Sequence, residues 1–223
     1  MTVAIGCFAA FRFWSTIMGL RKNYANIREI KRQMARTDEV YKNASYAVIT
    51  RVEMSPGWHE KFQRMEKEVL DLGFYHSHFY HNASFSAEGM PNFTSVYLRP
   101  DGHVQLTLYF SLWSNEPGLK IVDESRATER IHTTYTSIYP GPAWLVTSEG
   151  MGTIPWPESV TVFDHPKDTS IARLYEYHLE NMASPPWTAR QPLAVLNVQT
   201  FMEMQKQQHK VLNDTREKRK RLT

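Results

Sequence analysis

Cysteine is nearly absent from this chain of 223 residues, in which Cys7 is the only one. A single cysteine cannot form an intramolecular disulfide, so the chain does not belong to the small secreted domains held together by disulfides. Zinc sites built from several cysteines are excluded for the same reason. Cys7 also lies in an apolar segment, which does not favour the thiolate that a nucleophilic cysteine requires.

Motifs of common catalytic sites are missing as well. The sequence has no G-x-S-x-G elbow to position a serine nucleophile. The stretch SEGMGT at 148–153 contains glycines but lacks the lysine and the strand–loop–helix context of a phosphate-binding loop. Asp123 and Glu124 are adjacent on an expected strand end, so their carboxylates would face apart. These absences favour a non-enzymatic protein.

Acidic residues are scarce at both ends of the chain, and the positive charge lies there. Residues 1–36 contain seven Lys/Arg and one acid, and residues 216–223 contain five Lys/Arg and one acid. The net charge of +3 therefore divides into +6 and +4 at the ends and −7 over residues 37–215. An acidic body is a poor nucleic-acid surface. Basic ends beside an apolar segment suit an anionic membrane.

An uninterrupted apolar run of membrane-spanning length is also lacking, because Arg12 divides the segment VAIGCFAAFRFWSTIMGL at 3–20. Spanning needs about 20 apolar residues, and a central arginine costs about 2.5–3.5 kcal/mol on insertion scales. The same segment describes an interfacial amphipathic helix with its aromatic side toward the lipid. The residues expected to contact the membrane on that side are Phe8, Phe11, Trp14 and Met18.

Basic residues follow this segment directly, beginning with Arg21 and Lys22, which we expect to contact lipid headgroups. If the segment spans the bilayer, the positive-inside rule places the body in the cytoplasm. Two alternatives stay open: a mitochondrial presequence, because Glu29 is the first acid, and a helix that packs on protein. We predict a membrane-associated or packing helix at 1–22, followed by a basic linker or helix at 23–50.

Periodicity predicts a single α+β domain at 51–185. Apolar residues spaced three and four apart predict a helix at 56–72 that begins at Pro56 and stops at Gly73. Alternating patterns and the turn signals RPDG and YPGP predict an antiparallel meander of five or six strands. The strand-like segments from which these five or six strands would come are 74–81, 94–98, 103–112, 119–124, 130–138, 143–148 and 159–163, the fourth being the weakest.

Two further helical segments are predicted after the strands. The first, at 167–182, has Asp168 as its N-cap and His178 on its apolar side. We interpret His178 as a hydrogen-bonded core histidine. The second lies within 186–223 and ends in a basic tail.

The stretch FYHSHFYHN at 74–82 contains the candidate metal ligands His76 and His78. Alternate residues of a regular strand share a face, so these two imidazoles would point the same way. A third ligand would have to come from His103 or His132 on neighbouring strands. The sequence predicts no cofactor beyond this candidate divalent metal.

The leading hypothesis is a non-enzymatic, membrane-associated α+β protein that serves as an interaction or accessory subunit for a protein partner. One alternative is a metal- or small-ligand-binding protein or enzyme that uses the His76/His78 strand face. The other is a nucleic-acid binder that uses its basic ends, which the acidic body disfavours.

Overall fold

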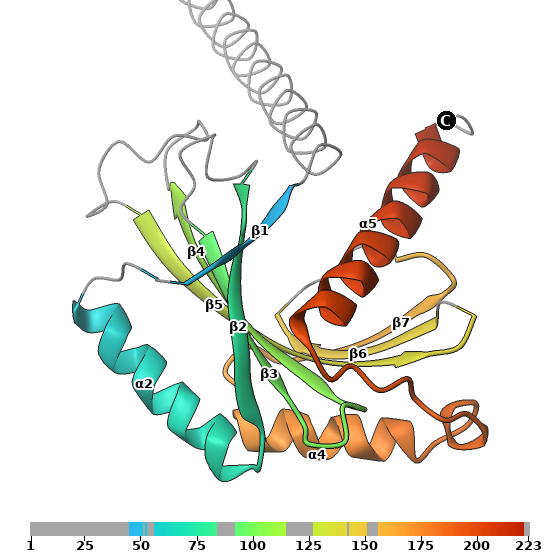
Figure 1. Ribbon diagram of the computed structural model, residues 1–223, viewed down its shortest axis with the longest axis horizontal. Helices are drawn as coiled ribbons and strands as arrows, with labels where there is room; N and C mark the ends of the chain where they lie inside the picture. Colours follow the sequence, from blue (N-terminus) through green and yellow to red (C-terminus); the bar gives the residue numbers. More distant parts are fainter. Residues whose placement is uncertain are drawn as a thin grey trace, which may run out of the picture. The chain divides into compact units, whose positions relative to one another are not determined.

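Over the residues that the structure describes, the fold is a seven-stranded sheet with helices on both faces (Figure 1). The computed structural model describes residues 45–50, 52, 56–83, 92–114, 127–141, 143–150 and 156–220, which lie within one compact unit. The elements are β1 (Tyr46–Ile49), α2 (Pro56–Asp71), β2 (Tyr75–Asn82), β3 (Asn92–Leu98), β4 (Gln105–Ser114), β5 (Ala127–Tyr139), β6 (Ala143–Glu149), β7 (Val160–His165), α4 (Ile171–Met182), the short 3-10 helix η2 (Trp187–Ala189) and α5 (Val198–Lys220).

The strands lie side by side in chain order from β1 to β7. Each pair from β1–β2 to β5–β6 is antiparallel, and β7 runs parallel to β6. The predicted α+β class is therefore confirmed, but the sheet has seven strands and is mixed rather than purely antiparallel. The link from Glu149 to Val160 is much longer than a hairpin turn, so the chain can return along β6 in the same direction.

Strand β1 is the strand that the sequence patterns did not predict. It is only four residues long and lies within the segment 23–50, expected to be a basic linker or helix. Its pairing with β2 comes from the tertiary fold, because the short stretch YAVI carries no flanking turn signal. The strand expected at 119–124 and the helix expected at 1–22 lie outside the described residues. Within the described part of the chain, no helix is long and apolar enough to cross a membrane.

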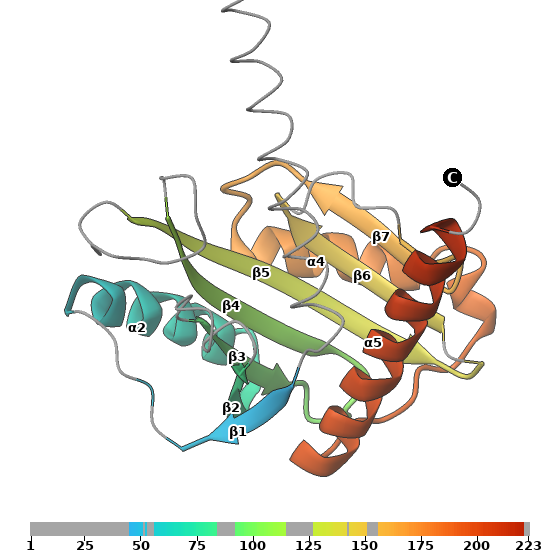
Figure 2. The same cartoon turned by 90° about the horizontal axis from the view of Figure 1, so that it is seen from above.

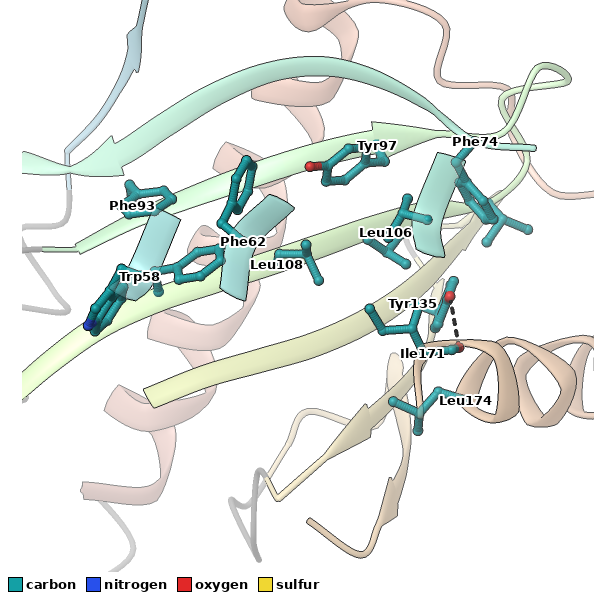
Figure 3. Packing of buried hydrophobic residues seen from close by; sticks show 13 residues of the cluster. Trp58, Phe62, Phe74, Phe93, Tyr97, Leu106, Leu108, Tyr135, Ile171 and Leu174 are labelled. Atoms are coloured by element: carbon teal, nitrogen blue, oxygen red, sulfur yellow. Dashed lines mark hydrogen bonds between the residues drawn. The ribbon is translucent and has the colours of Figure 1, made fainter. Parts of the chain in front are cut away.

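Helices α2 and α4 cover one face of the sheet and α5 lies on the other (Figures 1 and 2). The core under α2 is rich in aromatic rings. Phe62 of α2 contacts Phe110, with ring centroids 5.4 Å apart, and Phe93 stacks on Phe110 at 4.5 Å. Figure 3 shows Phe62 and Phe93 among the side chains of this core. Burying each such ring stabilises the fold by roughly 1.5–3 kcal/mol, which makes this face the main core.

The bounds of α2 follow from its sequence. The helix begins at Pro56, as predicted, because proline tolerates the first helical position. It ends before Gly73, whose φ of +84° is the left-handed conformation of a helix stop. The Gly73 N–H donates to the carbonyl of Leu70, 2.9 Å away. Ser55 precedes Pro56 and is a suitable N-cap by residue type, but it lies outside the described residues.

Helix α4 is capped by Ser170 rather than by the predicted Asp168. The Ser170 hydroxyl accepts a hydrogen bond from the Arg173 N–H. Asp168 instead adopts a left-handed φ of +73°, and its N–H donates to the Glu149 carboxylate at 3.0 Å. A carboxylate from α2 also reaches this helix end, because Glu68 accepts from the Ala172 N–H at 3.2 Å. Negative charge there is favourable, since free N–H groups make a helix N-terminus electropositive.

An extended segment at 190–197 brings the chain from η2 to α5. The Leu193 N–H donates to the carbonyl of Ile138, 2.7 Å away. The Val195 N–H donates to the carbonyl of Gly102 in the β3–β4 turn, 2.9 Å away, and Val195 is fully buried. These two backbone bonds fix where α5 starts on the sheet.

Candidate functional site

His76 and His78 lie on opposite faces of the sheet, so the prediction that they share a face is wrong. The reason is a β-bulge in β2 between these two residues. His76 pairs with Tyr97 of β3. His78, two residues later on β2, pairs with Val96, which is only one residue before Tyr97 on β3. A bulge adds one residue to the alternation and thereby reverses the side chain that follows it.

The two imidazoles consequently belong to different cores. His76 packs against Phe79 and Tyr97 on the α2 side, with ring centroids 4.4 Å and 5.2 Å away. Burial lowers the His76 pKa, and the nearby Glu66 carboxylate opposes that shift. His78 packs edge-on against Phe201 of α5 at 4.9 Å. Burial, assisted by His76, lowers the His78 pKa to about 4.

The other predicted ligands do not complete a metal site with this pair. His103 lies at the β3–β4 turn, where its Nδ1 is 3.5 Å from the Asp101 carboxylate. His132 lies on β5, on the α5 side of the sheet, with its Nδ1 3.4 Å from the carbonyl oxygen of Glu149. Among the described residues, no group of three His, Cys, Asp or Glu side chains is placed to hold a metal ion.

His178 is a fully buried, hydrogen-bonded histidine, as the sequence analysis predicted. Ser137 donates its hydroxyl hydrogen to the carbonyl oxygen of His103 at 2.8 Å. The His178 Nε2–H therefore donates to the Ser137 oxygen, 3.0 Å away, and Nδ1 accepts from the Thr147 hydroxyl at 3.0 Å. This arrangement fixes one neutral tautomer.

The serine and histidine of this network resemble a nucleophile–base pair only in their residue types. Ser137 and His178 are both fully buried between α4 and the sheet, and the serine hydrogen is already donated to a backbone carbonyl. Burial lowers the His178 pKa to about 3, and the Arg99 charge adds to that shift. We therefore assign this network to the stability of the fold.

A second set of polar side chains lies on the α5 side of the two central strands. Here β4 and β5 pair Gln105 with Thr136, Thr107 with Thr134 and Tyr109 with His132. Gln105 is buried and the other five are half-buried. We call this surface the polar face; it consists of Gln105, Thr107, Tyr109, His132, Thr134 and Thr136.

The polar face contrasts with the opposite side of the same strand. Leu106, Leu108 and Phe110 of β4 alternate with its polar residues, point toward α2 and are fully buried. A central strand that is covered equally on both faces carries apolar residues on both. At β4 and β5, therefore, the side toward α2 and α4 is closed, whereas the side toward α5 is partly accessible.

The chemistry of the polar face is hydrogen bonding without strong charge. It offers hydroxyl groups, one amide, a phenol and an imidazole, and no lysine, arginine, aspartate or glutamate. The Tyr109 and His132 rings are nearly parallel, with centroids 6.4 Å apart. Such a surface can donate and accept hydrogen bonds and offer flat rings for contact, but it lacks a paired general acid and base.

The sequence contained a signal for this surface. The alternation of Val104, Leu106 and Leu108 with polar residues predicts a half-buried strand, and β4 is one. The pattern could not predict which residues of the neighbouring strand lie beside those of β4. The pairing of Tyr109 with His132 depends on the register between β4 and β5, which the pattern of one strand does not contain.

The fold and this surface define a class: an α+β protein whose mixed sheet is closed on one side by α2 and α4 and carries, on the α5 side, a second apolar core beside a partly accessible polar surface on β4 and β5. Comparison with known proteins does not narrow that class. No protein-family model, no curated protein and no solved structure matches the chain significantly.

Proposed function

We propose that the chain is a non-enzymatic, membrane-associated protein that binds a protein partner through the polar face. The observation that carries the proposal is the difference between the two sides of β4: the side toward α2 is apolar and fully buried, whereas the side toward α5 is polar and, at Thr107 and Tyr109, half-buried. Partly accessible, uncharged hydrogen-bonding groups with aromatic rings suit the centre of a protein interface, where charged residues are depleted.

Membrane association rests on the sequence of the N-terminal segment. Its aromatic side, the basic residues that follow it and the acidic body together favour an arrangement in which the ends of the chain meet the lipid. In this arrangement the body carries the polar face to a partner at the same membrane.

Membrane binding is tested by flotation of the full-length protein with neutral phosphatidylcholine vesicles. Replacing Phe8, Phe11, Trp14 and Met18 by Gln is expected to reduce the bound fraction at least about tenfold, since each buried apolar side chain contributes about 1.5–3 kcal/mol. The matched control replaces Val48, Leu70, Leu179 and Leu196, four exposed apolar residues of the body, by Gln. Equal binding by both variants would contradict membrane association through the N-terminal segment.

The partner-binding surface is tested with a photo-crosslinking amino acid at Thr134 in membranes from the source cells. We expect an adduct of defined mass that is absent when the crosslinker replaces Glu60, an exposed residue of α2. Replacing His132 and Thr136 by Ala should weaken the adduct at least about fivefold, the effect of losing about 1 kcal/mol at an interface centre. If both crosslinker positions give the same adduct, or if Thr134 gives none, the polar face is not the partner-binding surface.

A further inference from the structure

We infer that the last turns of α5 form a second membrane contact, which binds the phosphate groups of anionic lipids. This inference deepens the proposed function and rests on its membrane association. The sequence alone shows a run of basic residues at 216–223. The structure adds that this run is part of a helix, because α5 continues without a break from Val198 to Lys220.

The first half of α5 is held on the sheet. Phe201 is fully buried, with its ring 4.9 Å from His78 and 5.7 Å from Tyr80. Further along, His209 contacts Tyr46 of β1, with centroids 5.8 Å apart. A helix rises 1.5 Å per residue, so the end of α5 lies about 28 Å along its axis from Phe201. Figure 1 shows this end standing off the side of the sheet opposite α2 and α4.

The charge of α5 is concentrated in its last turns. Over residues 198–209 the helix has one lysine and one glutamate, whereas residues 216–220 hold four basic residues and one acid. Cations at a helix C-terminus are stabilised by the helix dipole, which acts over the last turn. That effect explains one or two basic residues there and does not require four basic residues within 216–220 with a fifth at Arg221.

A membrane surface fits this charge distribution better than a nucleic acid does. The body between the ends carries −7 and would repel a polyanion that extends along it. A planar anionic surface can be contacted by the end of a helix alone, and both basic ends of the chain, +6 and +4, would be attracted to the same plane. Repulsion of the acidic body then orients the molecule with its ends toward the lipid.

The test uses the full-length protein with vesicles of phosphatidylcholine, alone or with about 30% phosphatidylglycerol, at about 0.1 M and about 0.5 M salt. The variant R216Q/K218Q/R219Q/K220Q removes four charges while keeping good helix formers, and circular dichroism checks that α5 is retained. The matched control, K61Q/R64Q/K67Q/K167Q, removes four exposed charges from the body.

At the lower salt concentration we expect the wild type and the control to bind anionic vesicles at least about tenfold more tightly than the variant, since each basic residue contributes about fivefold. At the higher salt concentration this difference should shrink, because screening weakens the attraction. Equal loss in variant and control, or no loss in the variant, would overturn the inference. So would tight binding of a DNA or RNA oligonucleotide by the wild type with no preference for anionic vesicles.

The result also separates this inference from the proposed function. Binding to neutral vesicles tests the N-terminal aromatic residues, whereas the preference for anionic over neutral vesicles tests the basic end of α5. If the F8Q/F11Q/W14Q/M18Q variant loses neutral binding while the α5 variant equals the wild type on anionic vesicles, the proposed function stands and this inference fails. If the aromatic variant binds like the wild type, the apolar anchor of the proposed function fails.

Discussion

Gly102→Ala is expected to lower the free energy of unfolding by about 3 kcal/mol or more. Gly102 has a φ of +72°, which costs an L-residue roughly 1–2 kcal/mol. An added Cβ would also lie 2.9 Å from both the backbone nitrogen and the carbonyl oxygen of Val195. Overpacking of this kind costs about 1–3 kcal/mol, and backbone cannot move aside as a side-chain end does. Chemical denaturation measures the loss.

Gly141→Ala is the matched control for this prediction. Gly141 has a similar φ of +82°, but nothing lies within 4 Å of the position of its added Cβ. We expect the control to lose only the conformational part, about 1 kcal/mol. Because Gly102 accepts the Val195 hydrogen bond that fixes the start of α5, Gly102→Ala should also speed proteolysis within 190–197. Equal losses in the two variants would show that the contact with Val195 does not matter.

Acidification is expected to destabilise the protein through His178. The pKa of this imidazole is about 3 in the folded state, against about 6.5 in an unfolded chain. Between these values the unfolded state binds the extra proton, so stability is complete above about pH 6.5 and falls as the pH decreases toward 3. The loss from this one residue between pH 7 and pH 5 is about 2 kcal/mol.

His178→Gln tests this pH dependence. The amide can donate to Ser137 and accept from Thr147 but does not titrate. Between pH 6.5 and pH 5 the stability of the variant should therefore fall less steeply than that of the wild type, by about 1 kcal/mol per pH unit. His178→Leu leaves the Thr147 hydroxyl without its partner and should cost a further 1–3 kcal/mol, roughly, at pH 7. His59→Gln, at an exposed position of α2, controls for the loss of an imidazole. An unchanged slope in His178→Gln would contradict the assignment.

Local patterns predicted the elements that depend on their own residues. The apolar stripe, Pro56 and Gly73 predicted α2 to within one residue, because a helix is stabilised by contacts three and four residues apart. The alternation in β4 predicted both the strand and its two unlike faces. The position of His178 among apolar residues predicted a core histidine, and the network with Ser137 and Thr147 confirms it.

Features that depend on distant partners were not predictable in this way. The bulge in β2 separates His76 from His78, and it exists because β3 pairs with β2 in a shifted register. Ser170 rather than Asp168 caps α4, because the Asp168 N–H is bonded to the carboxylate of Glu149 at the end of β6. Strand β1 forms because β2 offers it an edge, and β7 is parallel because the chain returns to β6 after a long link.

The α+β class, the division of charge between basic ends and acidic body, and the absence of disulfides can be read from composition and short-range periodicity. The face of the sheet that each histidine occupies, and the polar residues that meet across β4 and β5, emerge only when the strands are paired in three dimensions. The physical reason is register: one added residue reverses every later side chain of a strand, and the free energy that selects the register comes from neighbouring strands and helices.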